Sequence, residues 1–225
     1  MQLHKREVVE AATAILDNHG IADLTMRRLA RELDVSPGAL YWHFASKQQL
    51  LGAVADRILA PVCAEPDGGH WSDRIIRVGV RLRDALRSHT DGAELVSASF
   101  AAGQSASAAE MLARLTAAAT DAGLDPEQSV LAARTIVYYV LGFTVDEQAR
   151  LQWDAAGAAA IPPAADPDRD FAVGLQLLID GLTVRARRRR SSWANPDTVV
   201  LARQQQGKWD PRKATVHQDL SSGRR

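Results

Sequence analysis

Two short helical patterns lie close together near the start of the chain, and residues 34–37 separate them. The first pattern follows a potential N-cap, Thr25, and repeats apolar residues at spacings of three and four. The second follows Ser36, a favourable N-cap, and begins at Pro37, which suits the first position of a helix. A break of about four residues makes two helices cross steeply, as they do in a helix-turn-helix. The sequence therefore predicts that residues 1–60 form a small helical domain around this motif.

The rest of the chain has the same helical periodicity, and alternating strand patterns are absent from the sequence. Aromatic residues make up only 5% of the chain. We therefore expect an all-α protein, with an N-terminal three-helix domain and a larger C-terminal helical domain. The predicted parts are a helix-turn-helix domain at residues 1–60, a linker at 61–70, a helical domain at 71–187 and a basic, flexible tail at 188–225. Helices are expected at residues 3–18, 26–33, 37–44, 47–60, 93–102, 105–122 and 167–187, and others start at Trp71 and Pro126.

The helix that follows Asp125 is apolar on nearly every side between Val130 and Val145. Such a helix must be buried all round, by its own domain on one side and by a partner or a pocket on the other. Its most apolar part, residues 136–145, is too short to span a bilayer, and the N-terminus has no apolar signal region. The single cysteine, Cys63, excludes an internal disulfide. We therefore expect a cytoplasmic protein with no membrane partner.

Lys and Arg together number 27, and so do Asp and Glu, so any nucleic-acid footprint must be local. The side chains of the predicted helix at residues 37–44 suit such a local DNA-binding surface. Leu40 and Phe44 lie four residues apart and can anchor it to its domain. The side chains expected to face outward are Gly38, Ala39, Tyr41, Trp42 and His43.

Exposed aromatic side chains do little for folding, but they suit a helix in the DNA major groove, where they meet sugar-phosphate and thymine methyl groups. The alternative is that Tyr41 and Trp42 belong to the core. The local charge favours DNA, because only Glu32 and Asp34 oppose the cations between residues 25 and 50. Those cations are Arg27, Arg28, Arg31 and Lys47.

Residues 24–30 (LTMRRLA), residues 35–44 (VSPGALYWHF) and the pattern Lys47-x-x-Leu50-Leu51 closely resemble the DNA-binding domain of the TetR family. The resemblance implies that Arg27 contacts a base or a nearby phosphate of double-stranded operator DNA, and that Lys47 binds a phosphate. It also implies that small residues of the second helix approach the bases while its aromatic residues hold the backbone. The expected DNA-binding residues are Thr25, Arg27, Arg28, Ser36, Pro37, Gly38, Ala39, Tyr41, Trp42, His43 and Lys47.

Residues 70–185 resemble the regulatory domain of the tetracycline-repressor branch of this family. The resemblance rests on Trp71, the Asp-Gly-Ala turn at residues 91–93, the sequence LGFTVDEQ at 141–148 and the pattern at 171–182. It implies a homodimer, joined by a four-helix bundle that takes the helix after Asp125 and the final helix from each subunit. It also implies control by a small organic effector.

The residues with which that branch holds a magnesium–tetracycline chelate differ in this chain. Apolar or weakly polar side chains stand at those positions, and only Asp146 and the neighbouring Glu147 supply carboxylates. A chelated magnesium ion needs oxygen and imidazole donors. We therefore expect an apolar organic effector, with no metal and no cofactor, although plain core packing explains the same side chains equally well. The candidate ligand-binding residues are Cys63, Val78, Leu82, Val96, Phe100, Tyr138, Val145 and Asp146.

An enzyme is the main rival class, but the scattered histidines, the single cysteine and the lack of a phosphate loop or nucleophile motif argue against it. We therefore expect a ligand-responsive DNA-binding regulator, most simply a repressor. The alternative is an architectural DNA-binding protein without small-molecule control.

Two basic segments remain. Arg74, Arg77, Arg81 and Arg83 follow one face of the helix that starts at Trp71, and we expect a solvated face rather than a second DNA contact. Four consecutive arginines at residues 187–190 join the end of the helical domain to the tail. Blocks of like charge are usually solvated, and non-specific attachment to DNA is the alternative.

Overall fold

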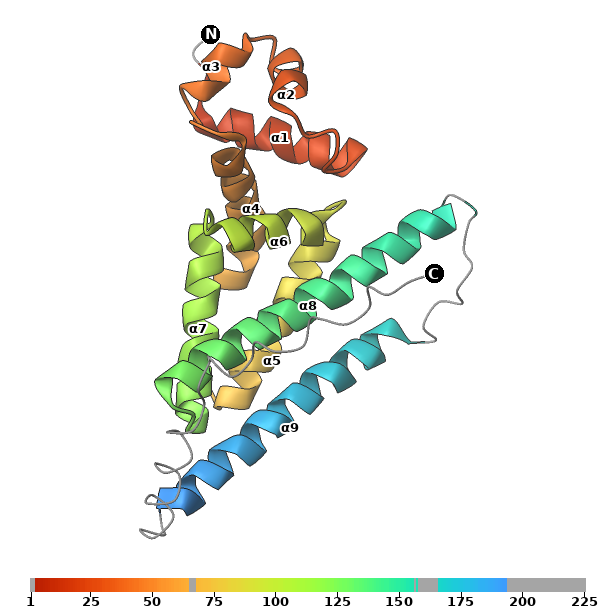
Figure 1. The fold of residues 1–225 in the computed structure, drawn as a ribbon. Coiled ribbons are helices and arrows are strands. Elements are labelled where there is room, and N and C mark those ends of the chain that lie inside the picture. Colours follow the sequence, from red (N-terminus) through yellow and green to blue (C-terminus); the bar gives the residue numbers. More distant parts are fainter. Residues whose placement is uncertain (1–2, 65–67, 156, 158–165, 194–225) are drawn as a thin grey trace, which may run out of the picture. The chain divides into compact units, whose positions relative to one another are not determined.

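The structure is a computed structural model that describes residues 3–64, 68–155, 157 and 166–193 (Figure 1). Every regular element in these ranges is a helix, which confirms the all-α prediction. The helices are α1 (Lys5–His19), α2 (Met26–Glu32), α3 (Pro37–Tyr41), α4 (Lys47–Cys63), α5 (Trp71–Arg87), α6 (Gly92–Ala102), α7 (Ala106–Ala122), α8 (Pro126–Ala155) and α9 (Pro167–Trp193). Residues 194–225, and with them most of the predicted tail, lie outside the described residues.

The helices α1, α2 and α3 form the N-terminal head, at the top of Figure 1. Gly20 has a φ of 77° and ends α1, with its N–H donating to the carbonyl of Leu16 at 2.8 Å. The third helix ends at Tyr41 and is shorter than the predicted 37–44, although Trp42 keeps a helical backbone and the Phe44 N–H still donates to the Leu40 carbonyl at 2.9 Å. Leu40 and Phe44 are nevertheless buried as expected, at 0% and 5% exposure.

The helix α4 runs from the head into the rest of the chain (Figure 1), and it continues three residues beyond the predicted end at residue 60. Its backbone passes so close to the α6–α7 turn that a Cβ at Gly52 would lie 2.2 Å from the carbonyl oxygen of Gln104. One turn further on, the carboxylate of Asp56 accepts hydrogen bonds from the Ser105 hydroxyl at 2.7 Å and the Ser107 N–H at 2.8 Å. The head is therefore fixed to the start of α7 through α4.

The helices α8 and α9 lie side by side in Figure 1, and their side chains meet. The Tyr139 hydroxyl donates to the Phe171 carbonyl at 2.8 Å, and the two rings stack with centroids 5.6 Å apart. In the single chain, residues 130–145 are buried on one side only, and Leu131 and Tyr138 are 64% and 56% exposed. The exposed side is the one for which the sequence predicted a partner or a pocket.

The helix α8 is also long and apolar enough to cross a membrane, by length and composition alone. Its apolar window is 44% buried against other helices, and it packs on α5, α6 and α7 as the core helix of a folded domain does. No other helix in the described ranges meets the same criterion.

Arg83 corrects the expectation that the arginine face of α5 is solvated, because its side chain is only 5% exposed. Its guanidinium donates to both carboxylate oxygens of Glu147 on α8, at 2.8 and 2.5 Å, and lies 2.8 Å from Asp168 at the start of α9. It also lies over the Phe171 ring, 4.7 Å from the centroid. The hydrogen bonds that Arg83 donates to Glu147 raise the pKa of Arg83 above its ordinary value, and this outweighs the opposite effect of burial. Two other arginines of that face are also engaged, since Arg74 pairs with Asp121 and Arg77 donates to the Gly68 carbonyl.

We expect Arg83→Ala to lower the free energy of unfolding by about 3 kcal/mol, because it leaves the Glu147 carboxylate, only 13% exposed, without its counter-charge. Urea denaturation followed by circular dichroism measures the loss. The matched control is Arg87→Ala, one turn along the same helix, where the side chain is 44% exposed and its ion pair with Asp168 is 3.5 Å long. That change should cost less than about 1 kcal/mol. Equal losses for the two variants would contradict a structural role for the buried pair.

Candidate nucleic-acid interface and effector site

The third helix presents its aromatic side chains to solvent. Tyr41 is 51% and Trp42 89% exposed, so the alternative that they belong to the core is wrong for this chain. Ser36 begins the helix by accepting a hydrogen bond from the Ala39 N–H at 3.3 Å, and Pro37 occupies its first turn. Of the other predicted residues, Gly38 is exposed, and Ala39 and His43 are partly buried.

The cationic side chains of the head differ in exposure and in ion pairing. Arg27 is exposed, whereas Arg28 is ion-paired with Asp23 at 2.9 Å. The hydroxyl of Thr25 accepts from the Arg28 N–H at 3.2 Å, so it is engaged as a helix cap. Lys47 occupies the first position of α4 and is partly buried. Arg27 is therefore the predicted arginine with the fewest local constraints.

Lys5 is a cation that sequence reasoning missed. Its Nζ lies 5.6 Å from the centroid of the Phe44 ring, directly after the third helix. Nothing in the spacing of the sequence relates these two residues, which are 39 positions apart, so only the fold brings the charge to this surface.

A second group of contacts joins the end of α1 to the turn between α5 and α6. The carboxylate of Asp91 accepts from the Ile21 N–H at 2.9 Å through one oxygen and from the Gln152 side chain at 2.6 Å through the other. Next to it, Thr90 donates to the Asp17 carbonyl at 2.9 Å. Asp91 therefore connects the head directly to α8, and the sequence had marked it only as part of a turn.

The predicted ligand-binding residues are not gathered around one described cavity. Val78, Leu82 and Val96 are buried at 6%, 1% and 1% exposure in the main apolar core. Phe100 packs edge-on against the exposed ring of Tyr138, with centroids 6.0 Å apart. The remaining members are Cys63, whose thiol donates to the Ser107 carbonyl at 3.6 Å, the exposed Val145, and Asp146.

Asp146 alone of that set lines a described cavity, which has a volume of about 460 Å³. This cavity lies where the end of α5, the last turns of α8 and the first turn of α9 meet, and we call it the junction cavity. Its walls combine apolar side chains, among them Phe143 and Leu151, with glutamines and charged groups.

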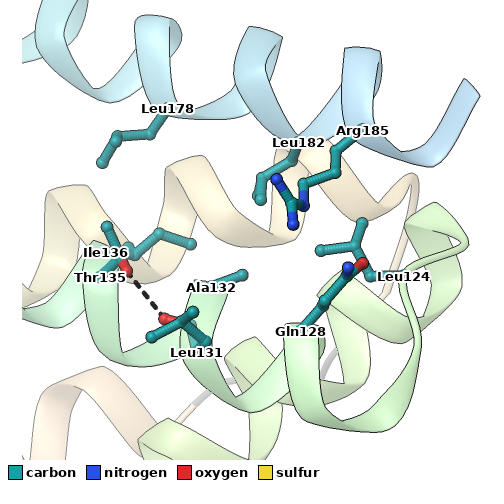
Figure 2. Close-up of a pocket in the computed structure, with 9 residues that line it drawn as sticks. All are labelled: Leu124, Gln128, Leu131, Ala132, Thr135, Ile136, Leu178, Leu182 and Arg185. Carbon is teal, nitrogen blue, oxygen red and sulfur yellow. Dashed lines mark hydrogen bonds between the residues drawn. The ribbon is translucent and has the colours of Figure 1, made fainter. Parts of the chain in front are cut away.

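A second cavity of about 250 Å³ is an apolar groove between α8 and α9 (Figure 2). Leu131 and Ile136 of α8 face Leu178 and Leu182 of α9 across it, and the Arg185 guanidinium turns toward one end. Within the described ranges, no three His, Cys, Asp or Glu side chains are grouped as a metal site would require.

Comparison with known proteins gives a consistent result. Residues 8–54 match the family model described as bacterial regulatory proteins, tetR family, and residues 63–166 match that of the tetracyclin repressor-like C-terminal domain. The tetracycline repressor protein class A from transposon 1721 of Escherichia coli is 29% identical over 205 residues, which cover 82% of this chain and 92% of the relative.

Solved structures are more similar still. The crystal structure of Mycobacterium smegmatis BioQ has 60% sequence identity and a TM-score of 0.74, and the match covers 81% of this chain and 99% of BioQ. BioQ with its natural double-stranded DNA operator matches at 59% identity and a TM-score of 0.71, with the same coverage. A point variant of TetR from Acinetobacter baumannii AYE, in complex with minocycline, matches at 30% identity and a TM-score of 0.65, covering 80% of this chain and 96% of that one.

Trp42→Ala and Leu40→Ala are neighbouring truncations that we expect to separate surface from core. Trp42 buries almost nothing, so its loss should change the free energy of unfolding by no more than about 0.5 kcal/mol. Leu40 is fully buried, and its loss should cost about 2–5 kcal/mol. Thermal and urea unfolding of both variants measures the difference. A destabilisation by Trp42→Ala as large as that of Leu40→Ala would show that the exposed ring has a folding role.

Proposed function

Because the chain belongs to the tetR family of bacterial regulatory proteins, we propose that it represses transcription by binding a palindromic operator as a homodimer and releases DNA when a small organic effector binds. The observation that carries the proposal is the 89% exposure of Trp42, directly after α3, together with the exposure of Arg27 on the neighbouring helix α2. A relative with 59% identity, BioQ, was crystallised with its double-stranded operator.

For the DNA contact we propose that α3 enters the major groove. Gly38 and Ala39 are small enough to let its backbone approach the bases, while Tyr41, Trp42 and His43 contact sugar-phosphate and thymine methyl groups. Arg27 contacts a base edge or phosphate, and Lys47 a phosphate. Arg28 contributes less to DNA binding, because it is ion-paired with Asp23. Thr25, Ser36 and Pro37 determine where α2 and α3 begin, and so they position the side chains that contact DNA.

For the dimer we propose that the exposed apolar side of α8 and α9 is the interface. Leu177 and Val173 of α9 are 66% and 51% exposed, and Leu131 and Tyr138 of α8 are 64% and 56% exposed. Large exposed apolar side chains on two neighbouring helices indicate a protein contact, and the apolar groove in Figure 2 lies between these helices and offers space for side chains of a second copy. A two-fold axis there would present two heads to a palindrome.

For the effector we propose a small organic molecule whose binding opposes operator binding. Of the predicted contacts, Val78, Leu82 and Val96 can be reached only if the core opens, because they pack against other apolar side chains. Val145 is accessible from outside in the single chain, and so is Tyr138, which the proposed dimer would cover. Linkage requires that effector and operator weaken each other reciprocally, typically by about 1–3 kcal/mol.

We expect Arg27→Ala to weaken binding to a duplex selected by the full chain from a random library by about 1–3 kcal/mol and to relax the preference at one base pair. Lys47→Ala should weaken selected and random duplexes alike, because a phosphate contact carries no sequence information. Fluorescence anisotropy over a range of salt concentrations measures both. Equal losses for the two variants on random duplex would sink this division of roles, and failure to select any duplex would sink the proposed function.

We expect Leu177→Glu to convert the dimer into a monomer and to abolish tight operator binding, because it places a charge in an apolar interface. The control is Val80→Glu, which puts the same charge on an apolar residue of α5 that is 41% exposed and away from the proposed interface. Light scattering coupled to gel filtration gives the mass of each variant. A Leu177→Glu protein that stayed dimeric would place the interface elsewhere.

A further inference from the structure

The junction cavity has a specific distribution of charge. Most of its charged groups are already paired, since Arg150 binds Asp146 at 2.9 Å and Glu147 is held by the buried Arg83. Two carboxylates of the wall, Asp154 at the end of α8 and Asp170 in the first turn of α9, form no ion pair within the described part of the chain. The unbalanced charge that faces the cavity is therefore negative.

The apolar part of the wall suits the body of an organic molecule. Phe143 is partly buried and packs edge-on against Phe171 of α9, with ring centroids 5.4 Å apart. Leu151 and Pro167 add exposed apolar surface beside it. Carboxylates beside an apolar wall attract a cation that carries an apolar body, because its charge is drawn to the carboxylates while its body packs on the wall. A volume of about 460 Å³ accommodates a molecule of drug-like size.

The cavity also borders the contacts that reach the head. Gln148 and Gln152, one turn apart on α8, both line it. Gln148 donates to the carbonyls of Leu86 and His89, at 3.0 and 2.7 Å, and so holds the α5–α6 turn. Gln152 donates to Asp91, whose other oxygen accepts from the N–H of Ile21. A molecule that moves either glutamine changes the hydrogen bonds through which this turn holds the end of α1.

We propose that the junction cavity binds an organic cation with an apolar body, and that this binding lowers operator affinity through Gln152 and Asp91. The inference rests on the proposed function only for its second half, because the cavity and its charges do not depend on DNA. It differs from a site among Val78, Val96 and Phe100, for which the core side chains would have to move apart.

Calorimetry with the full chain tests the site. The probes are benzyltrimethylammonium and two compounds of similar size, the neutral neopentylbenzene and the anionic 4-tert-butylbenzoate. We expect the cation alone to bind measurably, and the double variant Asp154→Asn, Asp170→Asn to weaken it by about fivefold for each carboxylate removed. The matched control, Asp73→Asn with Glu127→Gln, changes the net charge equally at exposed positions outside the cavity wall and should leave the cation affinity within about twofold. Preference for the anion or the neutral compound, no binding of the cation, or unchanged affinity in the double variant overturns the proposal.

Fluorescence anisotropy with the selected duplex tests the effect on DNA. Saturating benzyltrimethylammonium should weaken operator binding of the wild type about tenfold. Asp91→Gly removes the connecting carboxylate, and because Asp91 has a φ of 53° the glycine adopts its backbone without strain. This variant should bind the cation as before and no longer respond to it in operator affinity. A response of wild-type size would overturn the Asp91 route. If the full chain binds no duplex at all, the proposed function fails, but calorimetry still shows whether the junction cavity binds the cation.

Discussion

The buried guanidinium of Arg83 determines how the second half of the chain is assembled. A charged group in an apolar interior is tolerated only when opposite charges and hydrogen bonds compensate its lost hydration. Glu147 on α8 and Asp168 on α9 supply them, and the rings of Phe143 and Phe171 cover the remaining surface of the group. Three helices from distant parts of the sequence are therefore fixed at one point. Burial is also the main reason that the pKa of Tyr139, in the same aromatic group, is raised, and the charge of Arg83 opposes this rise.

The fixed end of α8 has consequences for the head. Because Glu147 is held by Arg83, the following residue, Gln148, and Gln152 one turn later face the α5–α6 turn, where they hold two carbonyls and Asp91. The same turn receives the end of α1, and α4 makes the other connection through Asp56. Each of these hydrogen bonds contributes on the order of 1 kcal/mol. A change in a few of them is therefore comparable with the coupling of about 1–3 kcal/mol by which regulated binding proteins respond to a ligand.

Local chemistry was sufficient to predict most helix starts and the motif of the head. Thr25 and Ser36 cap α2 and α3 through their hydroxyls, as their positions in the sequence suggested. The sequence was insufficient where contacts join distant residues. Arg83 has the pattern of a solvated face in its own helix, and only Glu147, 64 positions away, explains its burial. Leu131 and Ile136 of α8 are both aliphatic, yet Leu131 is exposed and Ile136 is buried, because packing against the other helices determines which side of α8 is covered.

A single helix connects the surfaces on which the proposed regulation depends. With 30 residues, α8 is about 45 Å long, and its middle and first turns carry the exposed leucine and tyrosine of the proposed dimer interface. Its last turns line the junction cavity and bind the turn that holds α1. A helix is stiff along its axis, so a ligand at one end cannot displace α8 without acting on the interface at the other. In a two-fold dimer the helix of the second copy resists such a displacement. The easier response to a ligand is then the release of a side-chain contact such as that between Gln152 and Asp91, which leaves the bundle intact and frees the head.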